Sequence, residues 1–504
     1  MKKSLRMFSV IGMVILMVVS VQKGFAQSSS GDTLKQEVVT LRDRVMGIEE
    51  RITTAENDLA KLTKIKLSGY IQAQWENYEN SSAYPYNYFS LRRVRLKVQY
   101  EPITGVAFVL QPDFVPGNIS LKDAYVQLNE PWLKTFSLWA GQFNRPNFEV
   151  EYSSSVREVP ERSRIIRALY PGERAIGAKL EIAPPKVPLL FQLAVLNGND
   201  NLTIRDAAGV NINPTNKDFD PYKDLMARFV YTFRLGNFGA LDLGVNGYYG
   251  KLKATSDTLL KSDYSVDKQV NVGSGLNRSW VGAELRLYMD IWGGLAIRSE
   301  WMMGVNAFPG YSSTASVTSP MTSSVSGDTL TLTALTTKTT SYLPNIRRNF
   351  MGGYVYLVKN IGKRHQIAVR WDYYDPNTKL KGDEIGVVKH DAGSSKSVTS
   401  TTTIPGSPTI IQNNTTKTVV SNTYKSGVDD IAYHTFTFAY NYSVTDNIRL
   451  QIAYEMPFNE KVGVSSSGTG NVTQKFTVNN LPGMNDYSTH VRQNVLTVRL
   501  QVKF

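Results

Sequence analysis

Residues 496–504 read LTVRLQVKF, and this stretch decides the fold class. Apolar residues occupy every second position, and polar residues fill the positions between them: Thr497, Arg499, Gln501 and Lys503. Such alternation is typical of a β-strand with one apolar and one polar face. An arginine or lysine that faced lipid near the bilayer midplane would cost about 2–4 kcal/mol, so we expect the polar face to line water.

Similar alternation recurs along the chain from Lys66 to Phe504 and predicts about sixteen strands. An even number of tilted strands of about ten residues is what a closed bacterial membrane barrel requires, and roughly 16–18 strands leave an aqueous channel. The expected class is an all-β transmembrane antiparallel barrel, preceded by a short coiled-coil helix. The predicted strands are 66–78, 88–101, 103–113, 119–130, 133–143, 174–183, 188–197, 224–234, 240–250, 279–290, 294–304, 349–360, 365–375, 430–442, 447–456 and 491–504.

The connections support a barrel that crosses a membrane. After Ala26 no run of apolar residues is long enough for a membrane helix, and a closed barrel is the other structure that satisfies its own backbone in lipid. Tight turns are predicted at 235–239, 360–364 and 444–446, and long polar connections alternate with them. Residues 311–341 and 391–424 are rich in serine and threonine and are expected to be solvated surface loops.

Residues 1–26 are expected to be a cleavable signal peptide. Lys2, Lys3 and Arg6 form a basic start, residues 7–21 are largely apolar, and Gly24-Phe25-Ala26 resembles a cleavage site. The alternative is an uncleaved anchor helix. Removing the peptide takes away four basic residues and no acid, so the formal net charge of +13 falls by four. The remaining basic chain favours anionic partners.

Residues 27–65 carry a heptad pattern. Apolar residues recur at alternating spacings of four and three, which predicts a coiled coil on the periplasmic side of the barrel. The alternative is a single amphipathic helix on the barrel mouth, although one helix cannot bury such a seam alone. The seam residues do not decide between a dimer and a trimer: Leu34, Val38, Leu41, Val45, Ile48, Ile52, Ala55, Leu59 and Leu62.

Positive charge on the predicted inner face is the main functional signal. Guanidinium and ammonium groups along a wet wall give an anion a series of weak sites, which allows both entry and escape. The alternative is structural pairing with acids of the same face: Asp123, Glu181, Asp242, Glu284, Glu300, Asp372 and Glu455. The expected lumen cations are Arg93, Arg95, Lys97, Arg286, Arg298, Arg370, Arg449, Arg499 and Lys503.

The connection at 144–173 is longer than a turn needs and is rich in arginine. It could fold into the barrel and narrow the pore. Alternatively, it projects outward with its arginines paired to Glu149, Glu151, Glu158 and Glu161. Four apolar residues, from Ile165 to Tyr170, favour packing against the barrel interior. The arginines of this region are Arg145, Arg157, Arg162, Arg164, Arg167 and Arg174.

Signals for chemistry are weak. The four histidines, at positions 365, 390, 434 and 490, lack metal-ligand spacing, and no nucleophile elbow or nucleotide-binding loop accompanies them. The polar segment 197–220 could hold Ca²⁺, but it lacks the regular ligand spacing of a calcium loop, so a solvated loop is favoured. Tyrosines cluster near predicted strand ends, as expected of the aromatic girdles at the membrane interfaces. The alternative is a series of aromatic rings along the lumen on which sugars stack. We therefore expect no enzyme, no cofactor, no metal site and no nucleic-acid partner.

Five segments together resemble the phosphate-selective porin O and P family: LSGYIQ at 67–72, LRRVRL at 91–96, LKDAYV at 121–126, GQFNRP at 141–146 and PGERAIG at 171–177. Each is a weak motif, but their order and spacing carry the resemblance over most of the barrel. The resemblance implies a trimer of sixteen-stranded barrels in the bacterial outer membrane, each with an inward constriction loop and a basic pore lining. The family's lysine-rich central anion site has no counterpart at particular positions in this chain.

The sequence therefore predicts a pore for passive diffusion of small solutes, which are expected to be anionic and could include phosphate. The residues expected to guide anions are Arg93, Arg95, Lys97, Arg157, Arg162, Arg164, Arg167, Arg370, Arg449 and Arg499. The expected partners are other copies of the chain, membrane lipid and, through the C-terminal Phe504, the barrel-assembly machinery. The alternative function is a structural tether, with the coiled coil reaching through the periplasm and the barrel serving as anchor.

Overall fold

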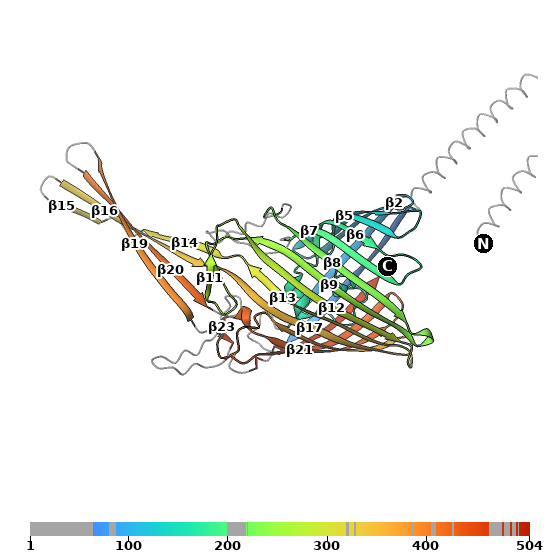
Figure 1. Cartoon of the computed structure of the whole chain (residues 1–504). Helices are drawn as coiled ribbons and strands as arrows, with labels where there is room; N and C mark the ends of the chain where they lie inside the picture. The colour runs from blue at the N-terminus through green and yellow to red at the C-terminus, as the bar shows by residue number, and fades with distance from the viewer. Residues whose placement is uncertain are drawn as a thin grey trace, which may run out of the picture. The chain divides into compact units, whose positions relative to one another are not determined.

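The computed structural model describes residues 64–504 apart from 80–86, 199–217, 219, 319–321, 327–328, 386–387, 405–409, 426–427, 463–475, 478–483, 486–489 and 492. Consecutive antiparallel pairings run around the barrel from β1, and β1 also pairs with the last strand, β25 (Figure 1). The sixteen-stranded sheet is therefore closed. The signal peptide and the coiled coil predicted for residues 1–65 lie, except for the last residues, outside the described part of the chain.

The sixteen barrel strands coincide with the sixteen predicted ones, with ends that differ by a few residues. They are β1 (Ile65–Tyr78), β2 (Asn87–Ile103), β3 (Val106–Val115), β4 (Asn118–Asn129), β5 (Phe136–Asn144), β6 (Arg174–Ile182), β7 (Leu189–Asn197), β8 (Lys223–Arg234), β9 (Gly239–Lys253), β12 (Gly275–Met289), β13 (Leu295–Phe308), β17 (Asn345–Ile361), β18 (His365–Asp375), β21 (Tyr433–Ser443), β22 (Ile448–Asn459) and β25 (Val495–Lys503).

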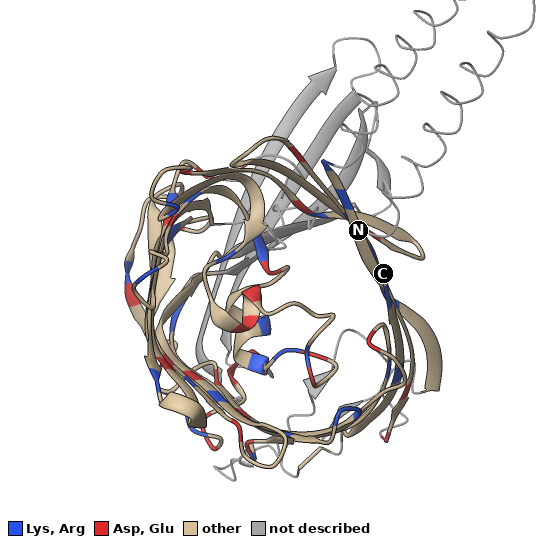
Figure 2. Ribbon diagram, turned by 90° about the vertical axis from the view of Figure 1, so that its right-hand side faces the viewer, with Lys and Arg blue, Asp and Glu red and all other residues tan. Residues whose placement is uncertain are grey.

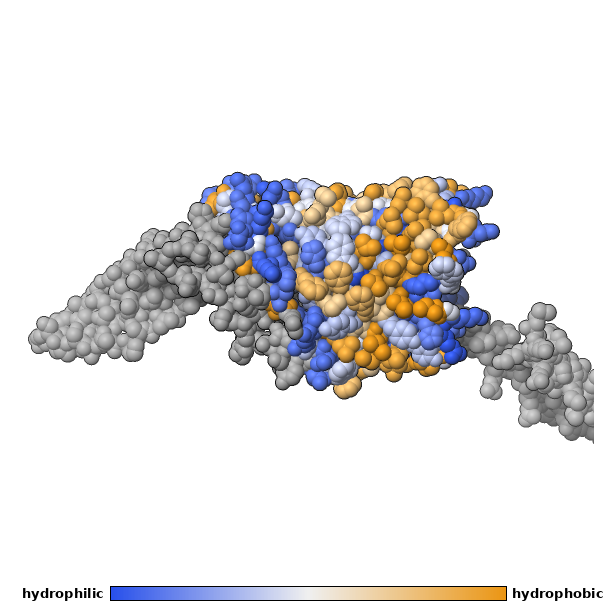
Figure 3. All heavy atoms as spheres, turned by 90° about the horizontal axis from the view of Figure 1, so that it is seen from below, coloured by the Kyte–Doolittle hydropathy of each residue, from blue (hydrophilic) through white to orange (hydrophobic). Residues whose placement is uncertain are grey.

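The two faces of the barrel wall differ as the alternation predicts. On β25, Leu500 and Val502 are 47% and 42% exposed, whereas Arg499 and Gln501 are only 2% and 3% exposed. Apolar side chains gather on the outer wall, with hydrophilic residues toward both ends (Figure 3). This outer surface suits lipid, and much of the inner surface is polar.

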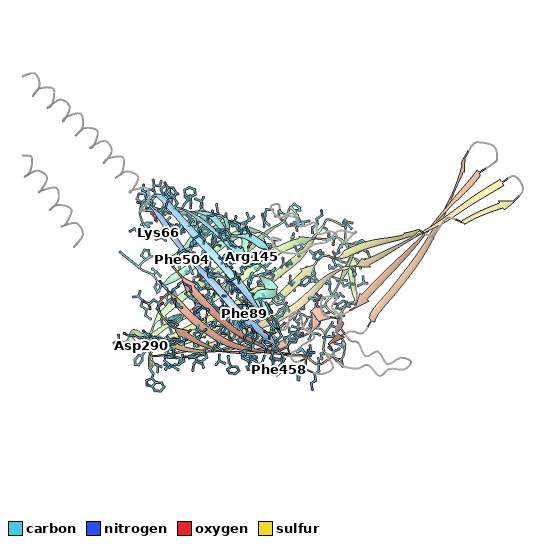
Figure 4. All side chains as sticks on the ribbon, turned by 180° about the vertical axis from the view of Figure 1, so that it is seen from behind. Lys66, Phe89, Arg145, Asp290, Phe458 and Phe504 are labelled. Atoms are coloured by element: carbon cyan, nitrogen blue, oxygen red, sulfur yellow. The ribbon has the colours of Figure 1, made fainter. Side chains whose placement is uncertain are left out.

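The two ends of the barrel differ in their connections. Lys66, Asp290 and Phe504 lie at one end, and Phe458 lies toward the other (Figure 4). The predicted tight turns at 235–239, 360–364 and 444–446 are confirmed at the first end, where the 3₁₀ helix η1 (Gly236–Phe238) joins β8 to β9. Long connections lie at the opposite end, which in bacterial barrels faces outward.

The long connections contain strands that the sequence did not predict. β10 (Thr258–Leu260) pairs with β11 (Val266–Gln269) and with β17. The segments expected to be surface loops instead form a separate five-stranded sheet from β14 (Tyr311–Thr318), β15 (Thr322–Ser326), β16 (Thr329–Leu343), β19 (Val388–Ile404) and β20 (Ile410–Lys425). Threonine and valine favour extended backbone, so their abundance is compatible with strands as well as loops. The remaining elements are η2 (Val428–Asp430), β23 (Phe476–Thr477) and β24 (Met484–Asn485).

Placing a charge on the outer wall should test the orientation of the strands. Val281 of β12 is 64% exposed in the isolated chain. We expect Val281→Lys to destabilise the folded barrel in lipid by about 2–3 kcal/mol, because the ammonium group would face hydrocarbon. Urea-dependent unfolding in vesicles measures this change, with Val281→Leu as the control. Equal stability of the two variants would contradict a lipid-facing position.

Candidate pore constriction

The segment between β5 and β6 lies inside the barrel when the molecule is viewed along the barrel axis (Figure 2). It carries two short helices, α3 (Phe148–Glu151) and α4 (Arg164–Leu169). The Asn147 side chain begins α3 by accepting a hydrogen bond from the backbone N–H of Val150 at 3.2 Å. We call residues 145–173 the constriction segment.

An apolar contact fixes one side of the constriction segment to the wall. Ile165, Ile166 and Tyr170 are at most 2% exposed and belong to one buried cluster with wall residues such as Met302 and Phe350. Gly352 of β17 permits this close approach, since a Cβ there would lie 3.1 Å from Cδ1 of Ile165. The interior packing predicted from Ile165, Ile166, Leu169 and Tyr170 is thus confirmed.

Glu161 is the main ionic anchor of the constriction segment. Its carboxylate accepts two hydrogen bonds from Arg92, both at 2.8 Å, and further bonds from Arg93 at 3.4 Å and Arg499 at 3.2 Å. Burial alone would favour the protonated acid, but the guanidinium groups of Arg93 and Arg92 hold the pKa of Glu161 well below its usual range. The carboxylate therefore stays ionised and joins strands β2 and β25 through the segment.

Glu158 forms the second anchor. Its two carboxylate oxygens accept hydrogen bonds from Arg298 of β13 at 2.6 and 3.0 Å. Its backbone carbonyl also accepts from the side-chain amides of Asn441 and Gln451, at 2.9 and 2.8 Å. Inward-facing amides on the strands thus hold the backbone of the segment, and the bidentate arginine fixes its direction.

A third group of contacts surrounds Glu149 and Asn147. Tyr356 of β17 donates to Glu149 at 3.1 Å, and Ser163 within the segment donates to the same carboxylate. The Asn147 amide donates to Glu300 of β13 at 2.9 Å. Together with Glu158 and Glu161, these contacts tie the segment to strands on several sides of the lumen, so a single well-defined position is expected.

The structure places four of the proposed anion-guiding arginines in ion pairs at the wall. Arg93 pairs with Glu161, Arg95 with Asp113 at 2.9 Å, and Arg370 with Asp372 at 2.9 Å. Arg499 also pairs with Glu161, and all four side chains are at most 6% exposed. The alternative of structural pairing therefore describes these four residues well.

The other proposed residues have different surroundings. Arg162 is buried within the segment, where it donates to the backbone carbonyls of Glu149 and Val150 and pairs with Glu173. Arg164 and Arg167 line a hollow at the outer end, and Arg449 lines one at the tight-turn end. Lys97 lies partly exposed on β2.

Arg157 differs from all of these arginines. It is 2% exposed, and among the described residues no hydrogen-bond acceptor is in reach of its three guanidinium nitrogens. Arg93, Arg162 and Arg499 lie close enough to Arg157 for electrostatic repulsion between the guanidinium groups. The charge of a buried cation is weakly screened by salt.

Both hollows at the ends of the lumen carry an excess of positive charge. The hollow at the tight-turn end has a volume of about 320 Å³, and its only acid among the described residues is Asp446. The basic residues that line it are Lys363, Arg364, Arg449 and Lys503. The outer hollow contains Arg164, Arg167 and Arg348 and one acid, Asp429. Basic side chains therefore outnumber acidic ones in the described lining of both hollows.

Sequence reasoning identified the arginines but not the groups that position the segment. Glu158 and Glu161 were expected, at most, to pair with arginines of their own loop, and the amides of Gln72, Asn441 and Gln451 were not singled out. Gln72 donates to the backbone carbonyl of Ser154 at 3.1 Å. The available signal was the presence of neutral amides at inward strand positions, where their donors can bind a backbone.

The described residues contain neither a cluster of metal ligands nor a helix suited to cross a membrane. No group of three or more aspartate, glutamate or histidine side chains there could hold a metal ion. No helix there has the length and apolar character to cross a membrane.

The model of the family described as phosphate-selective porin O and P matches residues 65–294. The family resemblance is thereby confirmed. With the closed barrel, the match to this porin family indicates an integral outer-membrane channel. No curated protein sequence matches the chain significantly.

Three solved structures are similar to this chain over most of its length. OprB of Pseudomonas putida has a TM-score of 0.49 and 8% identity, covering 90% of this chain and 96% of its own. The anion-selective porin from Comamonas acidovorans has a TM-score of 0.45 and 9% identity, covering 87% and 99%. OmpT of Vibrio cholerae has a TM-score of 0.44 and 7% identity, covering 87% and 97%.

Proposed function

We propose that the chain is a passive channel through which small anions diffuse in preference to cations. The observation that carries this proposal is Arg157, a buried guanidinium without a protein acceptor among the described residues, at the centre of the constriction segment. Glu158 and Glu161 of the same segment form their ion pairs with other arginines. An anion that passes this point is attracted, and a cation is repelled.

The arrangement also explains why anions would not be trapped. Arg95 and Arg370 are each paired with an acid of the wall, whereas Arg93 and Arg499 share the Glu161 carboxylate with Arg92. These pairs hold the segment in place, and the cluster around Glu161 keeps a net positive charge. The cations that an ion meets directly are the partly exposed ones, including Lys97, Arg167 and Arg449. Weak sites at both ends and a buried charge between them favour passage over tight binding. Phosphate is a small oxyanion and falls within this class.

Vesicle flux tests the proposal. Glucose, glucuronate and glucosamine have similar size but differ in charge. We expect proteoliposomes to admit glucuronate fastest, glucose more slowly and glucosamine slowest. Faster entry of glucosamine would contradict anion preference. No entry of any of the three would contradict a channel and favour the structural tether with a blocked lumen.

We further propose that residues 1–26 are removed on export and that residues 27–65 join three barrels through a coiled coil. The heptad pattern of 27–65 supports the assembly, since its apolar seam needs partners. The N-terminal residue of the purified chain is expected to be Gln27. Light scattering in detergent is expected to give a trimer that falls apart when Ile48 and Ile52 are replaced by lysine. A trimer that survives these changes would show that the barrels associate without the seam.

A further inference from the structure

The outer end of the lumen contains a hollow of about 740 Å³ beside α4. Its described lining comes from α4, β10, the outer ends of β13, β17 and β18, and the chain before β21. This volume suits a small organic molecule rather than a hydrated ion alone. We call this hollow the vestibule pocket.

One wall of the vestibule pocket is apolar and preformed. Leu260, Ile346 and Ile431 are 2%, 8% and 1% exposed and pack in one buried cluster. Phe308 and Tyr433 pack against that cluster and also line the pocket. Because these residues are held by their neighbours, a ligand would meet an apolar surface that needs no rearrangement. A small hydrated oxyanion has nothing to gain from such a wall.

The lining of the pocket also contains three arginines, which differ in how far they are already engaged. Arg348 is occupied, because it pairs with Asp430 at 2.9 Å and donates to Tyr264 at 2.8 Å. Arg164 lies over the ring of Tyr433, with its guanidinium carbon 3.9 Å from the ring centre. This stacked position limits how well Arg164 could bind a ligand.

Arg167 is the guanidinium best placed to receive a ligand. Its side chain is 44% exposed, and its recorded ion pair, with Glu455, is long at 3.8 Å. Glu455 is also bound by Arg370 at 3.2 Å, so Arg167 competes for a carboxylate that already has a closer partner. One available cation beside an apolar wall is complementary to a single negative charge on an apolar body.

We propose that the vestibule pocket binds monovalent anions with a compact apolar body, of which an aromatic carboxylate is the simplest case. The carboxylate would face Arg167, and the ring would lie toward Phe308 and Ile431. The ring of the ligand would displace water from the apolar wall, and its carboxylate would accept hydrogen bonds from Arg167 in place of those from water. This inference rests on the proposed anion channel for its biological role, since bound anions would be concentrated at the entrance.

Equilibrium binding to the full-length protein in detergent tests the inference without any flux. Benzoate is the probe, and acetate and inorganic phosphate are the comparisons, with titrations followed by saturation-transfer NMR. We expect benzoate to bind at least about tenfold more tightly than acetate, because the ring adds roughly 100 Å² of buried apolar area. Phosphate is expected not to displace benzoate. Equal affinities for benzoate and acetate would overturn the inference.

Two variants locate the site. Arg167→Gln removes the exposed charge and is expected to weaken benzoate binding about tenfold. Phe308→Ala is expected to weaken benzoate and leave acetate unchanged. The matched control is Arg347→Gln, because Arg347 is similarly exposed at 41% but pairs with Asp267 and does not line the pocket. Wild-type affinity in Arg167→Gln, or an equal loss in Arg347→Gln, would overturn the assignment.

The result can be separated from that of the proposed function. A protein that prefers anions in flux but binds no benzoate would exclude only the vestibule pocket. A protein that binds benzoate through Arg167 but prefers cations in flux would keep the pocket and exclude the anion channel.

Discussion

Replacing Glu161 with glutamine is expected to release the constriction segment from the wall and raise the single-channel conductance. Arg92, Arg93 and Arg499 would all lose their shared carboxylate. Removing one partner of a fully buried ion pair costs about 3–5 kcal/mol. A smaller cost is expected here, because Arg93 and Arg499 stay buried without their carboxylate but Arg92 is 41% exposed. The release is expected around residue 161, whereas contacts such as that of Glu158 with Arg298 hold other parts of this 29-residue connection.

The measurement is planar-bilayer conductance combined with limited trypsin digestion. We expect larger and noisier openings in Glu161→Gln, together with cleavage after Arg157 or Arg162, which are buried in the native protein. Asp267→Asn is the matched control, because it breaks the exposed pair with Arg347 and should cost about 0–1 kcal/mol. Native conductance and protease resistance in Glu161→Gln would show that this carboxylate does not hold the segment.

Replacing Arg157 with glutamate is expected to produce the largest change in ion selectivity. Two unit charges about 8 Å apart interact by roughly 2 kcal/mol at an effective dielectric constant of about 20, and this substitution reverses the sign. We therefore expect the anion-to-cation permeability ratio to fall by about tenfold, which corresponds to about 1.4 kcal/mol. The new carboxylate would lie among Arg93, Arg162 and Arg499, which should keep the variant folded.

Two further variants identify the cause of that change. Arg157→Gln removes the charge without reversing it and is expected to give an intermediate ratio. Arg234→Glu reverses a charge at the exposed end of β8, outside the constriction, and is expected to leave the ratio nearly unchanged. An unchanged ratio in Arg157→Glu would mean that the buried guanidinium does not act on the permeating ion.

The barrel could be predicted from the sequence because each strand carries its own signal. The alternation of apolar and polar residues in 496–504 predicts which side faces lipid, and the same pattern predicted all sixteen barrel strands. The long connections lack this alternation. Threonine-rich runs such as β16 and β19 are compatible with both loops and strands, and their pairing depends on segments far apart in the chain.

The constriction could be predicted only in part. The apolar residues Ile165 to Tyr170 indicated that the connection packs inside the barrel. The ionic contacts were beyond reach, because their partners are distant in sequence: Glu161 binds Arg93, 68 residues away, and its backbone carbonyl binds Arg370, 209 residues away. Charge pattern alone therefore could not separate the paired arginines from Arg157.

The reversal potential of the unmodified channel in a salt gradient tests the central claim most directly. Potassium chloride is made more concentrated on one side of a planar bilayer. A pore with a positive constriction should then give a reversal potential whose sign shows that chloride is more permeant than potassium. A potential of the sign set by potassium would contradict the account, whatever the conductance.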